Sequence, residues 1–366
     1  MAHVTPGRDG AARGNRGRRR DRGDARERAR RACGGSHPLV RVTPARSTAG
    51  RRRPVRTVSG MKRTTVTRSM LSMAAAAVLV LTTQVGPAAS GPTAGGGCLV
   101  DRLDELRVLR HRLDGLALDG RAGNSQYWYI DHQRCTLTIA TLRGAADPAT
   151  SAFLNTARLM PALVKIVELD AAIRSRVAKG PAADPNSHAA SGFHGGSAIY
   201  SGLTGTVLIC TAGFNGYRPN TTGTAGHCAR DAPTWYDGTG ALVGTVDQSR
   251  FPGADWAVIP AAEGLTLTAD IVDGDSTTAI TGFARPRLRD RVCATGASSG
   301  TRCGTIDATD VTVNYPEGAV TGLARSTQSG AAGDSGGPVH IGPTGVGLIS
   351  GGPPQGAPTF IQPLDF

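Results

Sequence analysis

Residues 330–340 read GAAGDSGGPVH, and this stretch decides how the rest of the chain is interpreted. It surrounds Ser335 with four glycines and places Asp334 directly before it. Because the chain has 50 glycines, a glycine-rich stretch alone carries little weight. Ser335 becomes a candidate nucleophile only if a base and an orienting acid occur elsewhere in the sequence.

Two further segments supply these residue types. TAGHC at 224–228 contains His227, and FPGADWAVI at 251–259 contains Asp255. Acyl transfer by a serine needs a base that takes the hydroxyl proton and a carboxylate that orients this base. The order His227, Asp255, Ser335 therefore forms a candidate catalytic triad.

The glycines near the serine add a second feature of such a site. They let the backbone N–H groups of Gly333 and Ser335 approach a developing oxyanion, an effect worth about 3 to 4 kcal/mol per donor. Each residue also has an ordinary structural interpretation. His227 could be a packed histidine beside a disulfide, and Asp255 could end a strand at a turn.

The segments around these residues have the texture of an antiparallel β protein. Short apolar runs alternate with turn residues, as at Asp237-Gly238 before ALVGTV, at Pro316-Glu317-Gly318 and at Pro343-Thr344-Gly345 before VGLI. This spacing predicts a barrel or a sandwich.

The sequence then resembles a known family, the chymotrypsin-type serine peptidases, and above all the secreted actinobacterial streptogrisin and alpha-lytic group. The similar segments run in the family's order from about Ala198 to Gly352: AIYSG, CTAGFN, TAGHC, FPGADWAVI, VCATGASSGTRCG, VTVNY, GDSGGPV and ISGG. The resemblance implies two antiparallel β-barrels with the active site in the cleft between them. It also implies that His227, Asp255 and Ser335 are the triad.

The same resemblance implies further roles. Ser350 matches a position that binds the substrate backbone, and Gly351 and Gly352 leave room for an extended substrate strand to pair there. The family's pairings imply the disulfides Cys210–Cys228 and Cys293–Cys303. Cys98 and Cys135 are then left to pair with each other.

The sequence departs from the family at several points. An arginine that usually neutralises the acid before the nucleophile is replaced by Ala294, so we expect Asp334 to pair with Arg302 or Arg325, because an unpaired buried carboxylate is costly. The disulfide that often braces the specificity pocket is missing at both ends, so the sequence does not predict substrate preference. The chain ends at FIQPLDF, where relatives continue.

The segment before the β-type region predicts a small α/β unit. Leucines at three- and four-residue steps predict a helix over 99–116, and 126–142 reads as two strands around a turn near His132. A second helix over 150–160 and a strand over 162–169 follow. Residues 179–196 have no apolar pattern and read as an exposed linker.

This α/β unit resembles the family's prosegment, with YWYIDHQRCTLTIAT as its most similar stretch. We therefore expect a prosegment at 91–192 and a serine peptidase domain at 193–366. The prosegment would act as a folding helper and inhibitor for the peptidase domain. The alternative is an ordinary α/β accessory domain.

The first 90 residues differ in composition from the rest. Residues 1–60 carry 17 Arg and 4 acidic residues, which accounts for the whole formal charge of +13, and they lack apolar periodicity. Met61 opens a basic start, a short apolar run and small residues typical of a signal peptide over 61–90. We therefore interpret residues 1–60 as a disordered segment upstream of the true start.

The cysteines agree with export. Only Cys33 precedes the signal, and the six cysteines after it form an even set, as a disulfide framework in an oxidising compartment requires. No CxxC pair suggests a zinc site. The predicted product is secreted and extracellular, and is not membrane-bound after signal cleavage.

The sequence therefore predicts a secreted serine endopeptidase, made as a preproprotein, that hydrolyses polypeptide substrates through an acyl-enzyme. We expect a monomer with no cofactor, no metal and no nucleic-acid partner. Two alternatives stay open. One is a catalytically weak binding protein of the same fold, suggested by Ala294 and the C-terminus, and the other is a nucleic-acid binder that uses residues 1–60.

Overall fold

The structure, a computed structural model, describes residues 98–364 except for 145, 184–191 and 275. The expected Arg-rich segment at 1–60 and signal peptide at 61–90 lie outside the described residues. Three parts are distinguished below: the α/β region (98–172), the connecting segment (173–183) and the β region (192–364). Among the described helices, none is long and apolar enough to cross a membrane.

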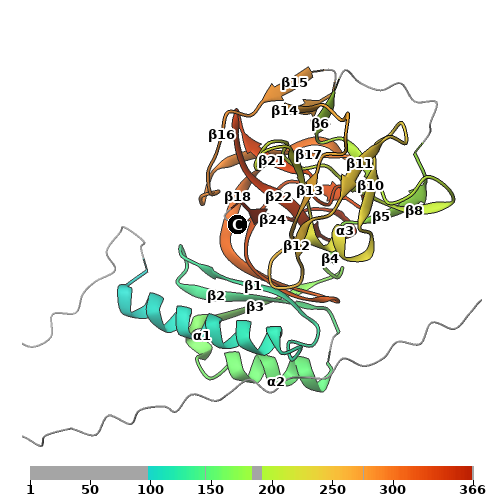
Figure 1. Ribbon diagram of the computed structural model, residues 1–366. Coiled ribbons are helices and arrows are strands. Elements are labelled where there is room, and N and C mark those ends of the chain that lie inside the picture. Colours follow the sequence, from blue (N-terminus) through green and yellow to red (C-terminus); the bar gives the residue numbers. More distant parts are fainter. Residues whose placement is uncertain (1–97, 145, 184–191, 275, 365–366) are drawn as a thin grey trace, which may run out of the picture. The chain divides into compact units, whose positions relative to one another are not determined.

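The α/β region has the elements that the sequence predicts. In Figure 1, two helices lie on one side of the strands of this region, which form one end of a larger sheet. The elements are α1 (Val100–Leu118), β1 (Ser125–Asp131), β2 (Thr136–Leu142), α2 (Pro148–Ala157), a 3-10 turn η1 (Pro161–Leu163) and β3 (Val164–Leu169). Strands β1 and β2 form an antiparallel hairpin, and β3 runs parallel to β2.

Burial explains why these helices lie on the sheet. The leucine stripe of α1 puts Leu106 and Leu113 fully inside the core, where they join Trp128, Ile139 and Phe153. The rings of Trp128 and Phe153 lie 4.9 Å apart, so they fix α2 against the sheet.

Local hydrogen bonding sets where α2 begins. Asp147 is the N-cap and its side chain accepts a hydrogen bond from the Thr150 N–H, while Pro148 stands at the first helical position.

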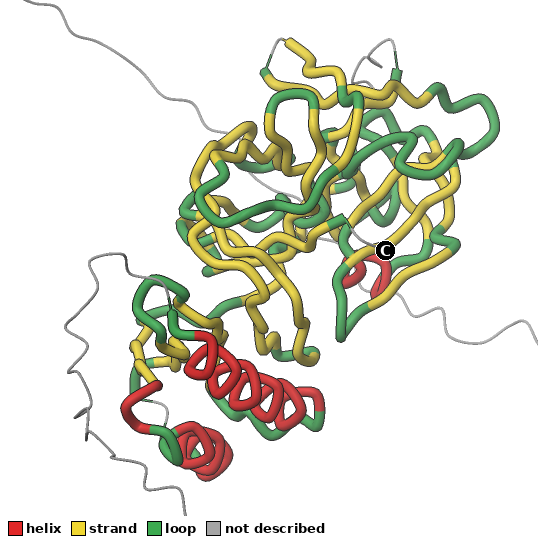
Figure 2. The backbone as a smooth tube through the Cα atoms, turned by 90° about the vertical axis from the view of Figure 1, so that its left-hand side faces the viewer, coloured by secondary structure: helices red, strands yellow, loops and turns green. Residues whose placement is uncertain are grey.

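The β region consists almost entirely of strands and loops, with one short helix, α3 (Gly226–Asp231) (Figure 2). Most of its strand pairs are antiparallel, which confirms the all-β class expected for residues 193–366. The strands are β6 (Phe193–Gly195), β7 (Ala198–Tyr200), β8 (Thr206–Thr211), β9 (Thr221–Thr224), β10 (Thr234–Tyr236), β11 (Leu242–Thr245), β12 (Gln248–Arg250), β13 (Trp256–Pro260), β14 (Leu267–Asp273), β15 (Ser276–Ala279), β16 (Gly282–Phe283), β17 (Arg291–Gly296), β18 (Gly300–Tyr315), β19 (Gly318–Ser326), β20 (Gly330–Ala331), β21 (Pro338–Ile341), β22 (Thr344–Gly352), β23 (Gln355–Gly356) and β24 (Thr359–Pro363).

One long hairpin of the β region joins the α/β region. Strand β18 pairs with β19 on one side and, through Thr312 and Val313, with β1 on the other, so that one sheet runs on from β18 into β1, β2 and β3. Asp114 of α1 accepts hydrogen bonds from the Thr312 hydroxyl at 2.7 Å and the Trp128 indole at 2.8 Å. The sequence does not predict this shared sheet.

The connecting segment corrects the expected linker. Two of its stretches are strands, β4 (Arg174–Ser175) and β5 (Ala178–Pro181), which pair with β22 and β8 of the β region. Phe193, near the end of the predicted linker, is buried in β6. The prediction of an exposed linker over 179–196 is therefore wrong at both ends, because backbone pairing needs no apolar pattern in the sequence.

Candidate active site

Three elements of the β region bring together the residues that the sequence singles out. His227 lies at the start of α3, Asp255 directly before β13, and Ser335 in the loop between β20 and β21. All three are buried, with exposed fractions of 3%, 0% and 0%.

The three side chains form one hydrogen-bonded line. The Nδ1 of His227 lies 2.9 Å from Oδ2 of Asp255, and its Nε2 lies 2.7 Å from Oγ of Ser335. The backbone N–H of His227 also donates to Oδ1 of Asp255 at 3.0 Å, and this second hydrogen bond holds the carboxylate beside the imidazole. This arrangement can move a proton from the serine hydroxyl to the imidazole.

Glycines allow the backbones to approach closely at this site. A Cβ at Gly226, next to His227, would lie 2.4 Å from the carbonyl oxygen of Arg250. A Cβ at Gly337, in the GDSGGP stretch, would lie 2.1 Å from the carbonyl oxygen of Thr295. Real Cβ contacts are longer than this, so both positions need glycine.

A second set of side chains positions the buried carboxylate. Ser350 donates its hydroxyl to Oδ2 of Asp255 at 2.6 Å, and the Asp255 N–H donates to Gln362 at 2.7 Å. Tyr315 shares a 2.8 Å hydrogen bond with Ser350, and burial, together with the charge of Asp255, raises the pKa of the Tyr315 hydroxyl. The family resemblance implies only a substrate-binding role for Ser350, and the sequence gives no role to Gln362 or Tyr315.

The connecting segment crosses this site. The carbonyl oxygen of Arg176 accepts from the N–H of Gly333 at 2.5 Å and from the N–H of Ser335 at 3.4 Å. These two donors are the ones expected to form the oxyanion hole, and Gly333 reaches its position with a positive φ of 102°.

Residues of the chain itself pair with the positions that are expected to bind a substrate strand. Gly351 pairs with Ser175, and Gly352 pairs with Arg174, in an antiparallel ladder. The positions named for binding an extended substrate therefore hold the protein's own residues.

Asp334 has other partners than expected. Its carboxylate accepts from the N–H groups of Ser298 at 3.1 Å and Ser299 at 2.9 Å, and from the Ser299 hydroxyl at 2.6 Å. Arg325 is instead bonded to Asp307, and the exposed Arg302 side chain donates to a neighbouring carbonyl. The prediction of Arg302 or Arg325 as partner is wrong, because loop N–H groups satisfy the carboxylate.

The cysteines pair as the sequence analysis expects. The disulfides are Cys210–Cys228, Cys293–Cys303 and Cys98–Cys135. The first ties the end of β8 to α3 beside His227, and the second joins β17 to β18. No cluster of His, Cys, Asp and Glu that could hold a metal ion occurs within the described residues.

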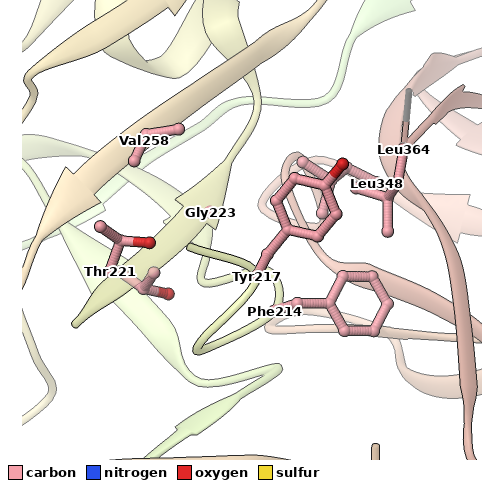
Figure 3. Close-up of a pocket in the computed structure, with 8 residues that line it drawn as sticks. Phe214, Tyr217, Thr221, Gly223, Val258, Leu348 and Leu364 are labelled. Carbon is pink, nitrogen blue, oxygen red and sulfur yellow. The ribbon is translucent and has the colours of Figure 1, made fainter. Parts of the chain in front are cut away.

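A separate apolar pocket lies elsewhere in the β region (Figure 3). Figure 3 shows the rings of Phe214 and Tyr217 beside Leu348 and Leu364, which belong to one apolar cluster. Thr221, Thr222, Gly223 and Val258 complete the lining. None of the triad candidates lines this pocket, so it is not the place where the serine acts.

An antiparallel β fold that buries an aspartate, a histidine and a serine in one hydrogen-bonded line defines the class of chymotrypsin-like serine proteases. No protein-family model matches the chain. It is 31% identical to streptogrisin-C of Streptomyces griseus over 81% of its own length and 62% of that protein. It is 34% identical to serine protease 2 of Streptomyces fradiae over 43% of its length and 93% of that protein.

The chain is similar to two further proteins. The chain is 33% identical to glutamyl endopeptidase 2 of Streptomyces griseus, over 43% of its length and 84% of that protein. It is also similar to the solved structure of Cellulomonas bogoriensis chymotrypsin, with 33% identity over 47% of this chain and 91% of that chain and a TM-score of 0.40. The chain spans 62% of streptogrisin-C and 44% of streptogrisin-D. It belongs to the streptogrisin group of chymotrypsin-like serine proteases.

Proposed function

We propose that the chain is the precursor of a secreted serine endopeptidase. The observation that carries this is the hydrogen-bonded line from Asp255 through His227 to Ser335, which ends beside two N–H groups that already hold a peptide carbonyl. A base, an oriented nucleophile and a pair of oxyanion donors are the parts that acyl transfer requires.

The reaction proceeds in two halves. Oγ of Ser335 attacks the peptide carbonyl carbon while Nε2 of His227 takes the hydroxyl proton, and Asp255 stabilises the imidazolium. The C–N bond then breaks, and the leaving amine takes the proton from His227. Water adds to the resulting acyl-enzyme, gives its proton to His227, and releases the acid as Ser335 recovers its hydroxyl. The N–H groups of Gly333 and Ser335 stabilise the oxyanion in both halves.

We also propose that the α/β region and the connecting segment inhibit the uncut precursor. The side chain of Ser335 is fully buried, and the site's substrate positions are filled by Arg174 to Arg176. A second chain cannot occupy the same positions, so the precursor stays inactive toward other proteins until residues 174–176 leave the site. Prosegment boundaries at 91–192 and a signal peptide at 61–90 are part of this proposal.

A folding role for the prosegment has a physical basis in the shared sheet. Antiparallel folds with distant strand pairs form slowly, and β18 finds a ready partner in β1 of the α/β region. We expect residues 193–366 refolded under oxidising conditions to recover less activity alone than with residues 91–192 added as a separate chain. Equal yields would leave the α/β region as an accessory domain.

Labelling with a fluorophosphonate tests the enzymatic proposal. The processed protein should react at Ser335, and a Ser335→Ala variant should stay unlabelled and lose peptidase activity while keeping its fold. A folded wild-type protein that neither reacts nor cleaves peptides would point to the alternative, a binding protein of this fold. The N-terminal sequence of the product from culture supernatant tests the role of residues 1–60.

A further inference from the structure

The side chain of Arg176 is an unusual buried group. It is 1% exposed, although arginine almost never lies fully inside a protein without partners. Its carbonyl is the one held by Gly333 and Ser335, so the side chain occupies the pocket that selects the residue before the cut bond.

Several oxygen atoms of the pocket accept hydrogen bonds from the guanidinium of Arg176. Nη1 donates to the Thr359 hydroxyl at 2.6 Å, and Nη2 donates to the carbonyls of Gly356 at 2.6 Å and Pro358 at 3.2 Å. The Thr359 hydroxyl itself donates to the Gln328 carbonyl, which leaves its lone pairs directed to the arginine. The planar guanidinium of arginine has several N–H donors that point in different directions, so it can bind these separate acceptors at the same time.

Two glycines leave room for the guanidinium of Arg176. A Cβ at Gly330 would lie 2.1 Å from Nη1 of Arg176, and a Cβ at Gly352 would lie 2.3 Å from Nη2. Any larger residue at either position would take the volume that the guanidinium occupies.

Asp334 supplies the opposite charge. Its Oδ2 lies 3.1 Å from the same Cβ position at Gly330 that borders the arginine. Burial lowers the pKa of Arg176, and the negative charge of Asp334 opposes that effect. The hydrogen bonds from Ser298 and Ser299 leave the negative charge of Asp334 in place, and this charge attracts a cation in the pocket.

We propose that this protease prefers arginine before the bond it cuts, and that its first cut is in its own chain, between Arg176 and Val177. This inference rests on the proposed function and adds its substrate class. The observation that carries it is the joint placement of the Arg176 carbonyl on the oxyanion donors and of its guanidinium in a pocket lined by oxygens.

The self-cleavage follows the two-half reaction above. Oγ of Ser335 bonds to the carbonyl carbon of Arg176, the bond to the nitrogen of Val177 breaks, and that nitrogen takes the proton from His227. Water then releases the carboxyl group of Arg176 from the ester. The carboxyl-terminal product then begins at Val177, within the expected prosegment 91–192, and its strand β5 stays paired with β8 of the β region.

Two measurements test the proposal. The first follows processing of the full chain by mass spectrometry, with Arg176→Ala compared with the control Arg158→Ala, an exposed arginine at the end of α2. We expect a new N-terminus at Val177 in the wild-type protein and in Arg158→Ala, and its loss in Arg176→Ala and Ser335→Ala. A first cut at any other bond, or an unchanged cut in Arg176→Ala, would overturn the self-cleavage.

The second measurement does not depend on how the variants fold. Processed wild-type enzyme is given peptides Ile-Ala-Ser-Xaa-p-nitroanilide with Arg, Lys, Phe or Glu at Xaa. We expect kcat/KM for Arg to exceed that for Phe and Glu by roughly 10³-fold, and that for Lys by about 10-fold. An enzyme that reacts with fluorophosphonate but prefers Phe or Glu refutes the arginine preference and leaves the proposed function intact. An enzyme that neither reacts with fluorophosphonate nor cleaves any of the four peptides refutes both the proposed function and the arginine preference.

Discussion

Replacing Gly330 with alanine should weaken the preference for arginine and leave the catalytic machinery in place. The added methyl carbon would stand 2.1 Å from Nη1 and 2.8 Å from Cζ of Arg176, while its third neighbour is only the Asp334 carboxylate at 3.1 Å. The guanidinium must therefore move, although no backbone atom is displaced. Gly330 has no positive φ, so alanine causes no backbone strain there.

The size of the effect follows from the contact that is lost. If the guanidinium shifts, Nη1 loses its 2.6 Å hydrogen bond to Thr359, and a hydrogen bond of a charged group is worth about 1.5 to 3 kcal/mol. With about 1.36 kcal/mol for each factor of ten in rate, kcat/KM for a peptide with arginine before the cut bond should fall roughly 10- to 150-fold. A peptide with alanine at that position does not reach the methyl group, so its kcat/KM should change little.

The assay compares these two p-nitroanilide peptides on the processed enzyme. Gly282→Ala is the matched control, because a Cβ at Gly282 meets no atom within 4 Å. An equal loss for both peptides would mean that alanine disturbs Ser335 and not the pocket. No loss for the arginine peptide would show that the guanidinium does not occupy the space beside Gly330, and the reasoning would be refuted.

Three further changes test other parts of the structure. Ser350→Ala removes the 2.6 Å hydrogen bond to the buried Asp255 carboxylate, so kcat should fall about 10-fold with little change in KM; a larger change in KM would assign the hydroxyl to substrate binding instead. Asp114→Ala removes the acceptor that the Thr312 hydroxyl uses, so the separated prosegment should inhibit the processed enzyme roughly 10-fold less tightly, and an unchanged inhibition constant would contradict that link. Asp147→Ala should destabilise the α/β region by about 1 kcal/mol in urea unfolding of the Ser335→Ala chain, whereas Asp147→Asn keeps the cap. The hydrogen bonds from Thr150 lower the pKa of Asp147, so its contribution is full at neutral pH and is lost as the pH falls below about 4; an Asn variant with the same acid sensitivity would argue against it.

Local patterns predict the elements well where burial repeats along the chain. The leucine steps over 99–116 become α1 (Val100–Leu118), and the segments around His227, Asp255 and Ser335 lie together in the β region. In these cases the residue types that mark the pattern in the sequence are also the ones that make the contacts in the folded protein.

The sequence could not predict the path of residues 174–176 through the site. Backbone pairing with Gly351 and Gly352 and a carbonyl placed on two N–H donors leave no trace in residue type. An arginine in a stretch without apolar periodicity reads as a solvated charge. Its burial depends on where Gly330, Gly352 and Gly356 come together, which is a property of the tertiary structure alone.

The partners of Asp334 were hidden for a related reason. Opposite charge is visible in a sequence, which is why Arg302 and Arg325 are the partners expected for Asp334. The carboxylate is held by the N–H groups and hydroxyl of a serine-containing loop, and such donors depend on loop geometry and not on charge.

The pairing of β18 with β1 bears on how the protein associates after the proposed processing. While the precursor is intact, the edge of β18 at Thr312 and Val313 is covered by a neighbouring strand. If the α/β region is removed as proposed, this edge loses its partner, and the adjoining apolar side chains Val311, Val313 and Leu323 lose part of their cover. An open sheet edge with apolar neighbours can add a strand from another chain. On the proposed processing, loss of the α/β region would open a new site of association, and we expect the processed protein to self-associate more readily than its precursor does.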